Sequence, residues 1–146
     1  MQLISFTWTS AALLIGRKTV TRRDWAPRQR ERFHAGDPVQ AWDKLPRNGG
    51  VRIATIRLTA EPVVESCRLM PEADYEAEGY AFYDERAAAG DEELVAAIRR
   101  GLDLRSWESC RSRFEVDRRD GREMTVVRFE LVEVSTAGLA LRRRAG

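Results

Sequence analysis

The sequence is poor in the side chains that most often bind metals or act as nucleophiles. Its 146 residues include two cysteines, Cys67 and Cys110, and one histidine, His34. These three cannot complete a closed zinc site without carboxylates, and two cysteines are too few for a disulfide framework. Because any histidine-assisted catalysis would depend on His34 alone, we assign His34 a structural or surface role. No metal and no cofactor is expected.

Long apolar segments are also missing. No run approaches the ~18 residues that a membrane-spanning helix needs, and the first residues show no basic start followed by an apolar stretch, as a signal peptide would. Hydrophobic residues make up 43% of the chain and charged residues 33%, which is typical of a globular protein. We therefore expect one cytoplasmic domain with its own core and no membrane partner.

Lysine is rare, and the charge is unevenly distributed. Arginine supplies 23 of the 25 basic residues, and the two lysines are Lys18 and Lys44. Arginine stays protonated in proteins, whereas burial can turn lysine into a base. Residues 1–60 hold eleven basic against four acidic residues, and residues 61–98 hold two against eleven. Either the basic segment binds a phosphate-bearing partner, or the acidic segment folds back and neutralises it.

The pattern of apolar residues predicts a mixed fold. Period-two alternation and strand-forming residues predict strands over residues 3–7, 38–42, 51–60 and 124–134. Capping residues and glycines predict helices over residues 11–15, 71–79, 92–100 and 107–114. Strands do not alternate regularly with helices, so we predict the α+β class, as a small, partly closed β-barrel with peripheral helices.

Residues 16–24 hold the densest group of chemically useful side chains. They combine an amine (Lys18), two hydroxyls (Thr19 and Thr21) and neighbouring guanidinium groups. Lys18 and Thr21 face the same side in a turn or helix, but opposite sides in a fully extended chain. The alternative to a functional site is a solvated basic loop or a strand with polar side chains.

The run Gly-x-Lys-x-x-Thr-x-Arg at residues 16–23, after a strand and a short helix, resembles the signature of the ASCH family, within the PUA-like superfamily. Other features follow in the family's order: Gly36-Asp37 opening a strand, the hairpin through Gly49-Gly50, the strand over 51–60, and Glu-x-Glu-Gly at 76–79. The resemblance covers residues 3–82 and the last strand. It implies a PUA-like barrel domain over residues 1–136, with a helical insertion at about 84–116. Residues 137–146 are expected to form a flexible basic tail.

The resemblance also implies a cleft for RNA or a nucleoside. The commoner motif has Glu where this chain has Thr21, and the Thr form resembles a bacterial amidohydrolase branch that deacetylates N4-acetylcytidine. Its working residues fall on Lys18, Thr21 and Glu78, with Glu76 as the alternative carboxylate. Lys18 would then accept a proton, Thr21 would attack the acetyl carbonyl, and Glu78 would orient the amine or pass a proton to the leaving nitrogen.

Side chains near the motif complete the predicted site. The candidates for binding substrate or RNA are Arg17, Arg22, Arg23, Trp8, Trp25 and Tyr80. Trp8 and Trp25 flank the motif, and each either stacks on a base or belongs to the core or its rim. Two alternatives to amide hydrolysis remain: an RNA-binding module without chemistry, and a ribonuclease using the same cleft. The oligomeric state is not predicted.

Overall fold

A computed structural model of the chain describes residues 1–102 and 108–145. Its strands form one sheet in the order β1-β3-β4-β6-β2, with β5 also paired to β6. The parallel pair is β1 and β3, and the other pairs are antiparallel. The strands are β1 (Leu3–Ser5), β2 (Val20–Arg23), β3 (Pro38–Trp42), β4 (Arg52–Leu58), β5 (Val63–Ser66) and β6 (Glu123–Val134).

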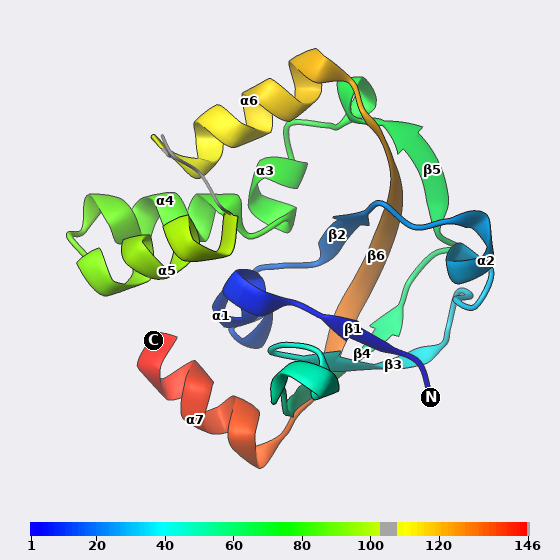
Figure 1. The fold of residues 1–146 in the computed structure, drawn as a ribbon, viewed down its shortest axis with the longest axis horizontal. Helices are drawn as coiled ribbons and strands as arrows, with labels where there is room; N and C mark the ends of the chain where they lie inside the picture. Colours follow the sequence, from blue (N-terminus) through cyan, green and yellow to red (C-terminus); the bar gives the residue numbers. More distant parts are fainter. Residues whose placement is uncertain (103–107, 146) are drawn as a thin grey trace.

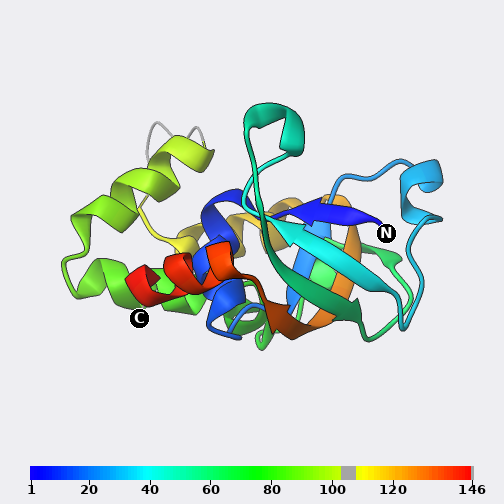
Figure 2. The same ribbon diagram turned by 90° about the horizontal axis from the view of Figure 1, so that it is seen from below.

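Most helices lie to one side of the strands, whereas the short α2 lies on the opposite side (Figures 1 and 2). The α-helices are α1 (Ser10–Leu14), α2 (Pro27–Arg30), α3 (Asp74–Ala77), α4 (Tyr80–Ala88), α5 (Glu92–Leu102), α6 (Cys110–Asp120) and α7 (Thr136–Ala145). The short 3₁₀ helices are η1 (Thr7–Thr9), η2 (Pro46–Asn48) and η3 (Cys67–Leu69). Within the described ranges, no helix has both the length and the apolar character needed to cross a membrane.

The long strand β6 gives the sheet its curvature. Its residues 129–134 pair with β4, whereas residues 123–128 pair with β2 and β5. The sheet therefore curls into a half-barrel (Figure 1). β1 and β2 form the two ends of the strand order, and Arg23 on β2 bridges them by donating from Nη2 to the Ser5 carbonyl at 2.6 Å.

Two apolar clusters stabilise this arrangement. The first fills the curl of the sheet and includes Phe6 and Phe129, whose rings pack edge to face. The second joins α1 to α4 and α6 through Ala12, Tyr83 and Cys110. Both cysteines are buried, as expected for small apolar side chains. The site described below lies between the two clusters, and side chains that line it pack against both of them.

The predicted α+β class, with a barrel-like sheet and peripheral helices, is confirmed. The hairpin of β3 and β4 and the final strand lie where alternation placed them. Helices α4 to α6 lie between β5 and β6 in the chain. The helix expected over 107–114 is α6, and its expected first residue, Trp107, lies outside the described residues.

The expected flexible tail is wrong. Residues Thr136–Ala145 form α7, which packs against α1 and β4. Gly138 is buried, and a Cβ there would lie 2.0 Å from the Ile53 carbonyl oxygen. This close approach seats the helix directly on the β4 backbone, a contact that the composition of the segment did not reveal.

Candidate active site

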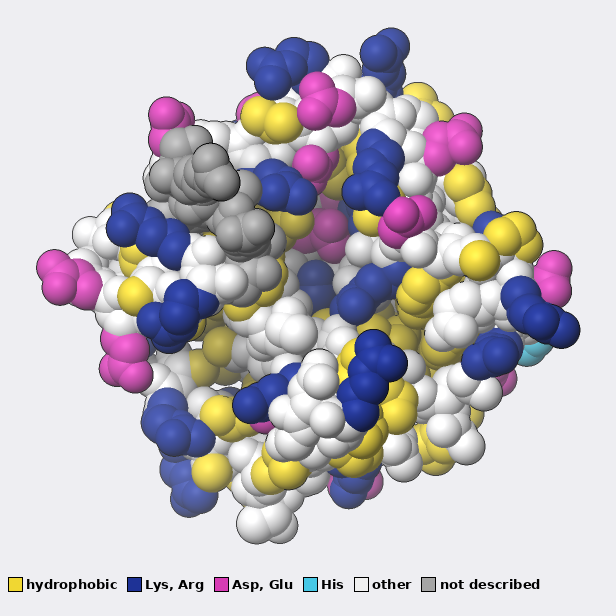
Figure 3. Space-filling view, viewed as in Figure 1, with side chains coloured by type: hydrophobic (Ala, Val, Ile, Leu, Met, Phe, Trp, Pro, Cys, Tyr) yellow, Lys and Arg dark blue, Asp and Glu magenta, His cyan; other side chains and the backbone are white. Residues whose placement is uncertain are grey.

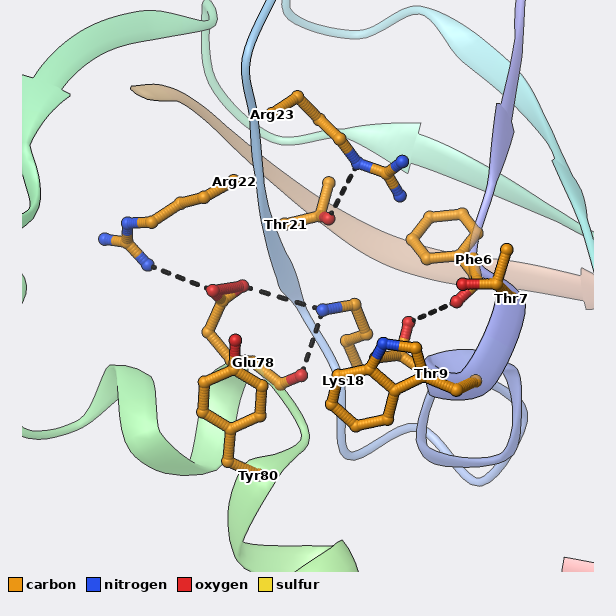
Figure 4. Close-up of a pocket in the computed structure, with 10 residues that line it drawn as sticks. Phe6, Thr7, Thr9, Lys18, Thr21, Arg22, Arg23, Glu78 and Tyr80 are labelled. Carbon is orange, nitrogen blue, oxygen red and sulfur yellow. Dashed lines mark hydrogen bonds and ion pairs between the residues drawn. The ribbon is translucent and has the colours of Figure 1, made fainter. Parts of the chain in front are cut away.

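A pocket of about 200 Å³ lies where β2 faces β1 and η1. Figure 3 shows that this face of the molecule is hollowed at its centre, with basic and acidic side chains inside the hollow. The residues that line the pocket are Phe6, Thr7, Trp8, Thr9, Lys18, Thr21, Arg22, Arg23, Glu78 and Tyr80. Figure 4 shows how the polar groups among them converge.

Lys18 and Thr21 both line the pocket and are each 4% exposed. Thr21 belongs to β2, whereas Lys18 lies in the irregular segment before it. Strict strand alternation therefore does not extend to Lys18, and the two side chains share a pocket although Thr21 is in an extended strand. The segment between them is held by hydrogen bonds from Thr19 N to the Ala77 carbonyl, at 2.8 Å, and from Phe129 N to the Thr19 carbonyl, at 3.0 Å.

Glu78 supplies the carboxylate of the pocket, while Glu76 points elsewhere. Lys18 Nζ donates to the Glu78 carbonyl at 2.9 Å and lies 3.5 Å from Glu78 Oε1. Glu76 is exposed and ion-pairs with Arg17 at 2.8 Å. Gly79 makes this geometry possible, because its φ of +90° turns the chain directly after Glu78.

Burial changes the acid–base behaviour of Lys18. Removal from water lowers the pKa of its ammonium group from 10.5 to about 8. The Glu78 carboxylate opposes this shift, whereas the charges of Arg23 and Arg22 add to it. About a tenth of the amine is therefore neutral at pH 7, and most of it above pH 8; the neutral amine is the form that accepts a proton.

Arg22 connects the pocket to a buried ionic cluster. Its Nη2 donates to Asp74 at 2.6 Å, and Arg128 donates to both oxygens of the same carboxylate at 3.1 and 2.9 Å. Burial alone would raise the pKa of Asp74, but the hydrogen bonds from Arg128 and Arg22 bring it below its ordinary value. On its other side, Arg22 Nη1 lies 3.7 Å from Glu78 Oε2.

Arg23 lies beside the candidate nucleophile. Its Nε donates to Thr21 Oγ1 at 3.1 Å, and its guanidinium group lies over the Phe6 ring at 5.5 Å from the centroid. With its bond to Ser5, these contacts hold a cation next to the hydroxyl. A fixed cation at this position is suited to stabilising negative charge that develops when the hydroxyl attacks a carbonyl.

One of the two flanking tryptophans belongs to the pocket. Trp8 lies parallel to Tyr80, with ring centroids 6.0 Å apart and an interplanar angle of 6°, and both line the pocket. Burial raises the pKa of Tyr80 well above its ordinary value, so its hydroxyl stays protonated. Trp25 instead stacks on Phe33 at 4.5 Å and packs against the core of the sheet, which agrees with the core alternative for that residue.

Acidic residues do fold back onto the basic segment. Arg17 does not line the pocket and is bound by Glu76 and Glu85. The ion pairs of Lys18 with Glu78 and of Arg22 with Asp74 follow the same pattern. Three of the eleven basic residues of residues 1–60 are thus paired with carboxylates of the acidic segment.

The sequence did not single out Phe6, Thr7 or Thr9, which line the pocket. Thr7 has a φ of +45°, which is rare for a β-branched residue. Its carbonyl accepts a hydrogen bond from Ser10 at 2.7 Å, which holds this turn in place. Such backbone outliers concentrate at functional sites, but the sequence pattern does not predict where they occur.

Comparison with known proteins shows a distant fold relationship. No protein-family model matches the sequence, and no curated protein matches it. Among solved structures, the chain is similar to protein EF3133 from Enterococcus faecalis V583, described by the family model DUF984. The TM-score is 0.51 and the identity 21%, over 92% of this chain and 82% of that chain. The two proteins therefore share a fold at a distance.

Proposed function

We propose that this protein hydrolyses the amide of an N4-acetylcytidine-like substrate. The observation that carries the proposal is the shared pocket of three buried side chains: an amine with a lowered pKa (Lys18), a hydroxyl (Thr21) and a carboxylate (Glu78). The fold agrees with it, because DUF984 is an ASCH-like family. The ASCH-type motif at residues 16–23 supplies two of the three groups.

The chemistry follows from the roles that these groups can take. Neutral Lys18 removes the proton of Thr21, directly or through a water, and Thr21 Oγ1 attacks the acetyl carbonyl. The protonated Lys18, oriented by the Glu78 carboxylate, then returns the proton to the amide nitrogen. The C–N bond breaks, and the nitrogen leaves as an amine. Water, activated by the same amine, hydrolyses the acetyl ester on Thr21 and releases acetate.

The surrounding residues support a nucleoside-sized substrate. Trp8 and Tyr80 form an aromatic wall on which a base can stack, and Arg23 stands beside Thr21 to stabilise the oxyanion. A volume of about 200 Å³ is below the roughly 300–1,000 Å³ of pockets for drug-sized ligands. A single base with its acyl group suits such a pocket better than a polymer.

Internal ion pairing argues against the alternatives of RNA binding and RNA cleavage. A cleft for an RNA chain needs several cations that are free to reach successive phosphates. Here Glu76 and Glu85 hold Arg17, and Asp74 holds Nη2 of Arg22, which leaves few free donors for a long chain. The amide hydrolase therefore remains the function that the site supports best.

The test is turnover of N4-acetylcytidine, followed by chromatography, in matched variants. Lys18→Arg keeps the charge but removes the base, and Thr21→Val keeps the shape but removes the hydroxyl. Each should lower kcat/KM by roughly 10²–10⁴-fold, while Thr21→Ser should retain measurable activity. Lys44→Arg, on an exposed loop, is the control for the same change and should behave as wild type.

Two results would overturn the proposal. Full activity in both Lys18→Arg and Thr21→Val would remove these residues from the mechanism. A wild-type protein that leaves N4-acetylcytidine intact but shortens a labelled RNA would identify the ribonuclease alternative instead.

A further inference from the structure

A second cavity, of about 140 Å³, adjoins the candidate active site. It shares Arg22, Glu78 and Tyr80 with the first pocket. Its far wall includes Arg113 and Asp117 of α6 and, just after that helix, Arg122. The second cavity is therefore built in part by α6, and the three shared residues separate it from the first pocket.

Arg22 brings an unsatisfied donor to this cavity. Its side chain is 6% exposed, and Nη2 is bound to Asp74. Within the described part of the chain, Nη1 has no hydrogen-bond partner, since Glu78 Oε2 is 3.7 Å away. A buried guanidinium nitrogen without an acceptor is costly, so an acceptor supplied by a ligand would stabilise it.

Two further guanidinium groups and two carboxylates line the cavity with Arg22. Arg113, which lines the cavity, contacts Asp117 through Nε at 3.3 Å. Burial raises the pKa of Asp117, and the neighbouring Arg113 opposes this shift. Arg122 pairs with Asp24. The remaining carboxylate, Glu78, is offset by Lys18 at 3.5 Å. When Asp74 and Asp24 are counted, each guanidinium group has a carboxylate partner. The cavity therefore offers hydrogen-bond donors, above all Arg22 Nη1, rather than an excess of positive charge.

We propose that this second cavity binds the phosphate group of a nucleotide, so that the substrate is an acylated cytidine 5′-monophosphate. The inference rests on the proposed function, because the first pocket would hold the base. Guanidinium groups match phosphate oxygens in charge and geometry. The small volume suits one terminal phosphate. An RNA chain would need a cavity that is open at both ends, because the chain continues beyond each phosphate.

Calorimetric binding of unreactive ligands tests the cavity. Cytidine 5′-monophosphate should bind about tenfold more tightly than cytidine, as one charge-assisted hydrogen bond allows, and inorganic phosphate should compete with it. Arg113→Gln should abolish this preference. Arg119→Gln is the matched control, because Arg119 lies on the same helix with its side chain 75% exposed and outside the cavity lining. Arg122→Gln, at a side chain 63% exposed, repeats the test where folding is not at risk.

The outcomes separate this inference from the proposed function. Equal affinity of the wild type for the nucleotide and the nucleoside overturns it, even if N4-acetylcytidine is hydrolysed. Tighter binding of a short oligocytidylate than of the mononucleotide also overturns it, because the phosphate would then belong to a chain. A nucleotide preference that Arg113→Gln removes and Arg119→Gln keeps supports it, even if no acetylated substrate is turned over.

Discussion

Among single side chains, Lys18 owes its acid–base chemistry to its surroundings. It is one of two lysines in an arginine-rich chain, and it is almost completely buried against the carbonyl of Glu78. An arginine at this position would keep its proton. A lysine at this position can therefore act as a base, because the fold removes its amine from water and places two further cations nearby.

This environment predicts a pH dependence. The pKa of Lys18 is lowered to about 8, and the neutral amine is the active form, so kcat/KM should rise with pH and level off above a midpoint near 8. Because the Glu78 carboxylate raises this pKa, Glu78→Gln should move the midpoint of the remaining activity to lower pH. Initial rates measured over about pH 6 to 10 check both points. A midpoint near the ordinary lysine value would contradict the proposed role of Lys18.

Among the structural elements, the turn between α3 and α4 decides the position of the carboxylate. Glu78 directly follows α3 as its C-cap, and Gly79 takes up a left-handed conformation before α4 begins. A Cβ on Gly79 would lie 2.8 Å from the Cβ of Ala12 in α1. The turn is thus pressed against α1, and this contact sets the distance between Glu78 and Lys18.

Gly79→Ala should therefore destabilise the protein in two ways. The left-handed conformation costs a non-glycine residue about 1–2 kcal/mol, and the clash with α1 adds about 1–3 kcal/mol. Gly90→Ala is the matched control, because Gly90 has a φ of +86° but nothing within 4 Å of the new Cβ. Urea denaturation of both variants checks the difference, and equal losses of stability would show that the approach to Ala12 is not limiting.

Across the whole molecule, α7 ties the sheet to the helical side. Leu141 packs against the cluster inside the curl of the sheet, while Ala145 packs against the cluster between α1 and the other helices. The C-terminal segment thus touches both clusters that hold the candidate site. A chain that ended in a flexible tail would leave β4 and α1 uncovered on this side.

Leu141→Ala should lower the free energy of unfolding by about 1–2 kcal/mol, the low end for leucine truncation because the side chain is only half-buried. Leu139→Ala makes the same change on the same helix, at a side chain 38% exposed, and should cost less than about 0.5 kcal/mol. Urea unfolding curves check the pair. If both variants match the wild type, the packing of α7 contributes no stability.

Local pattern was sufficient for much of the fold. Alternation predicted β3, β4 and β6, because the side-chain period of a strand is written directly into neighbouring residues. It was insufficient for α7, whose ten residues carry a cluster of arginines that looked like a frayed end. Packing against β4 and α1 stabilises that helix, and such packing involves residues far away in the chain.

The candidate site likewise has a part that the sequence predicted and a part that only the folded chain decided. Lys18 and Thr21 are three residues apart, so one motif was enough to connect them. The choice of Glu78 over Glu76 required the folded chain, because the carboxylate lies 60 residues beyond Lys18 and reaches it through the turn at Gly79. Two predicted site residues lie outside the pocket for the same reason. Trp25 stacks on Phe33, and Arg17 forms ion pairs with two glutamates. Periodicity acts over neighbouring residues, whereas a pocket is made by contacts between distant ones, and those contacts exist only once the sheet has curled and the helices have packed against it.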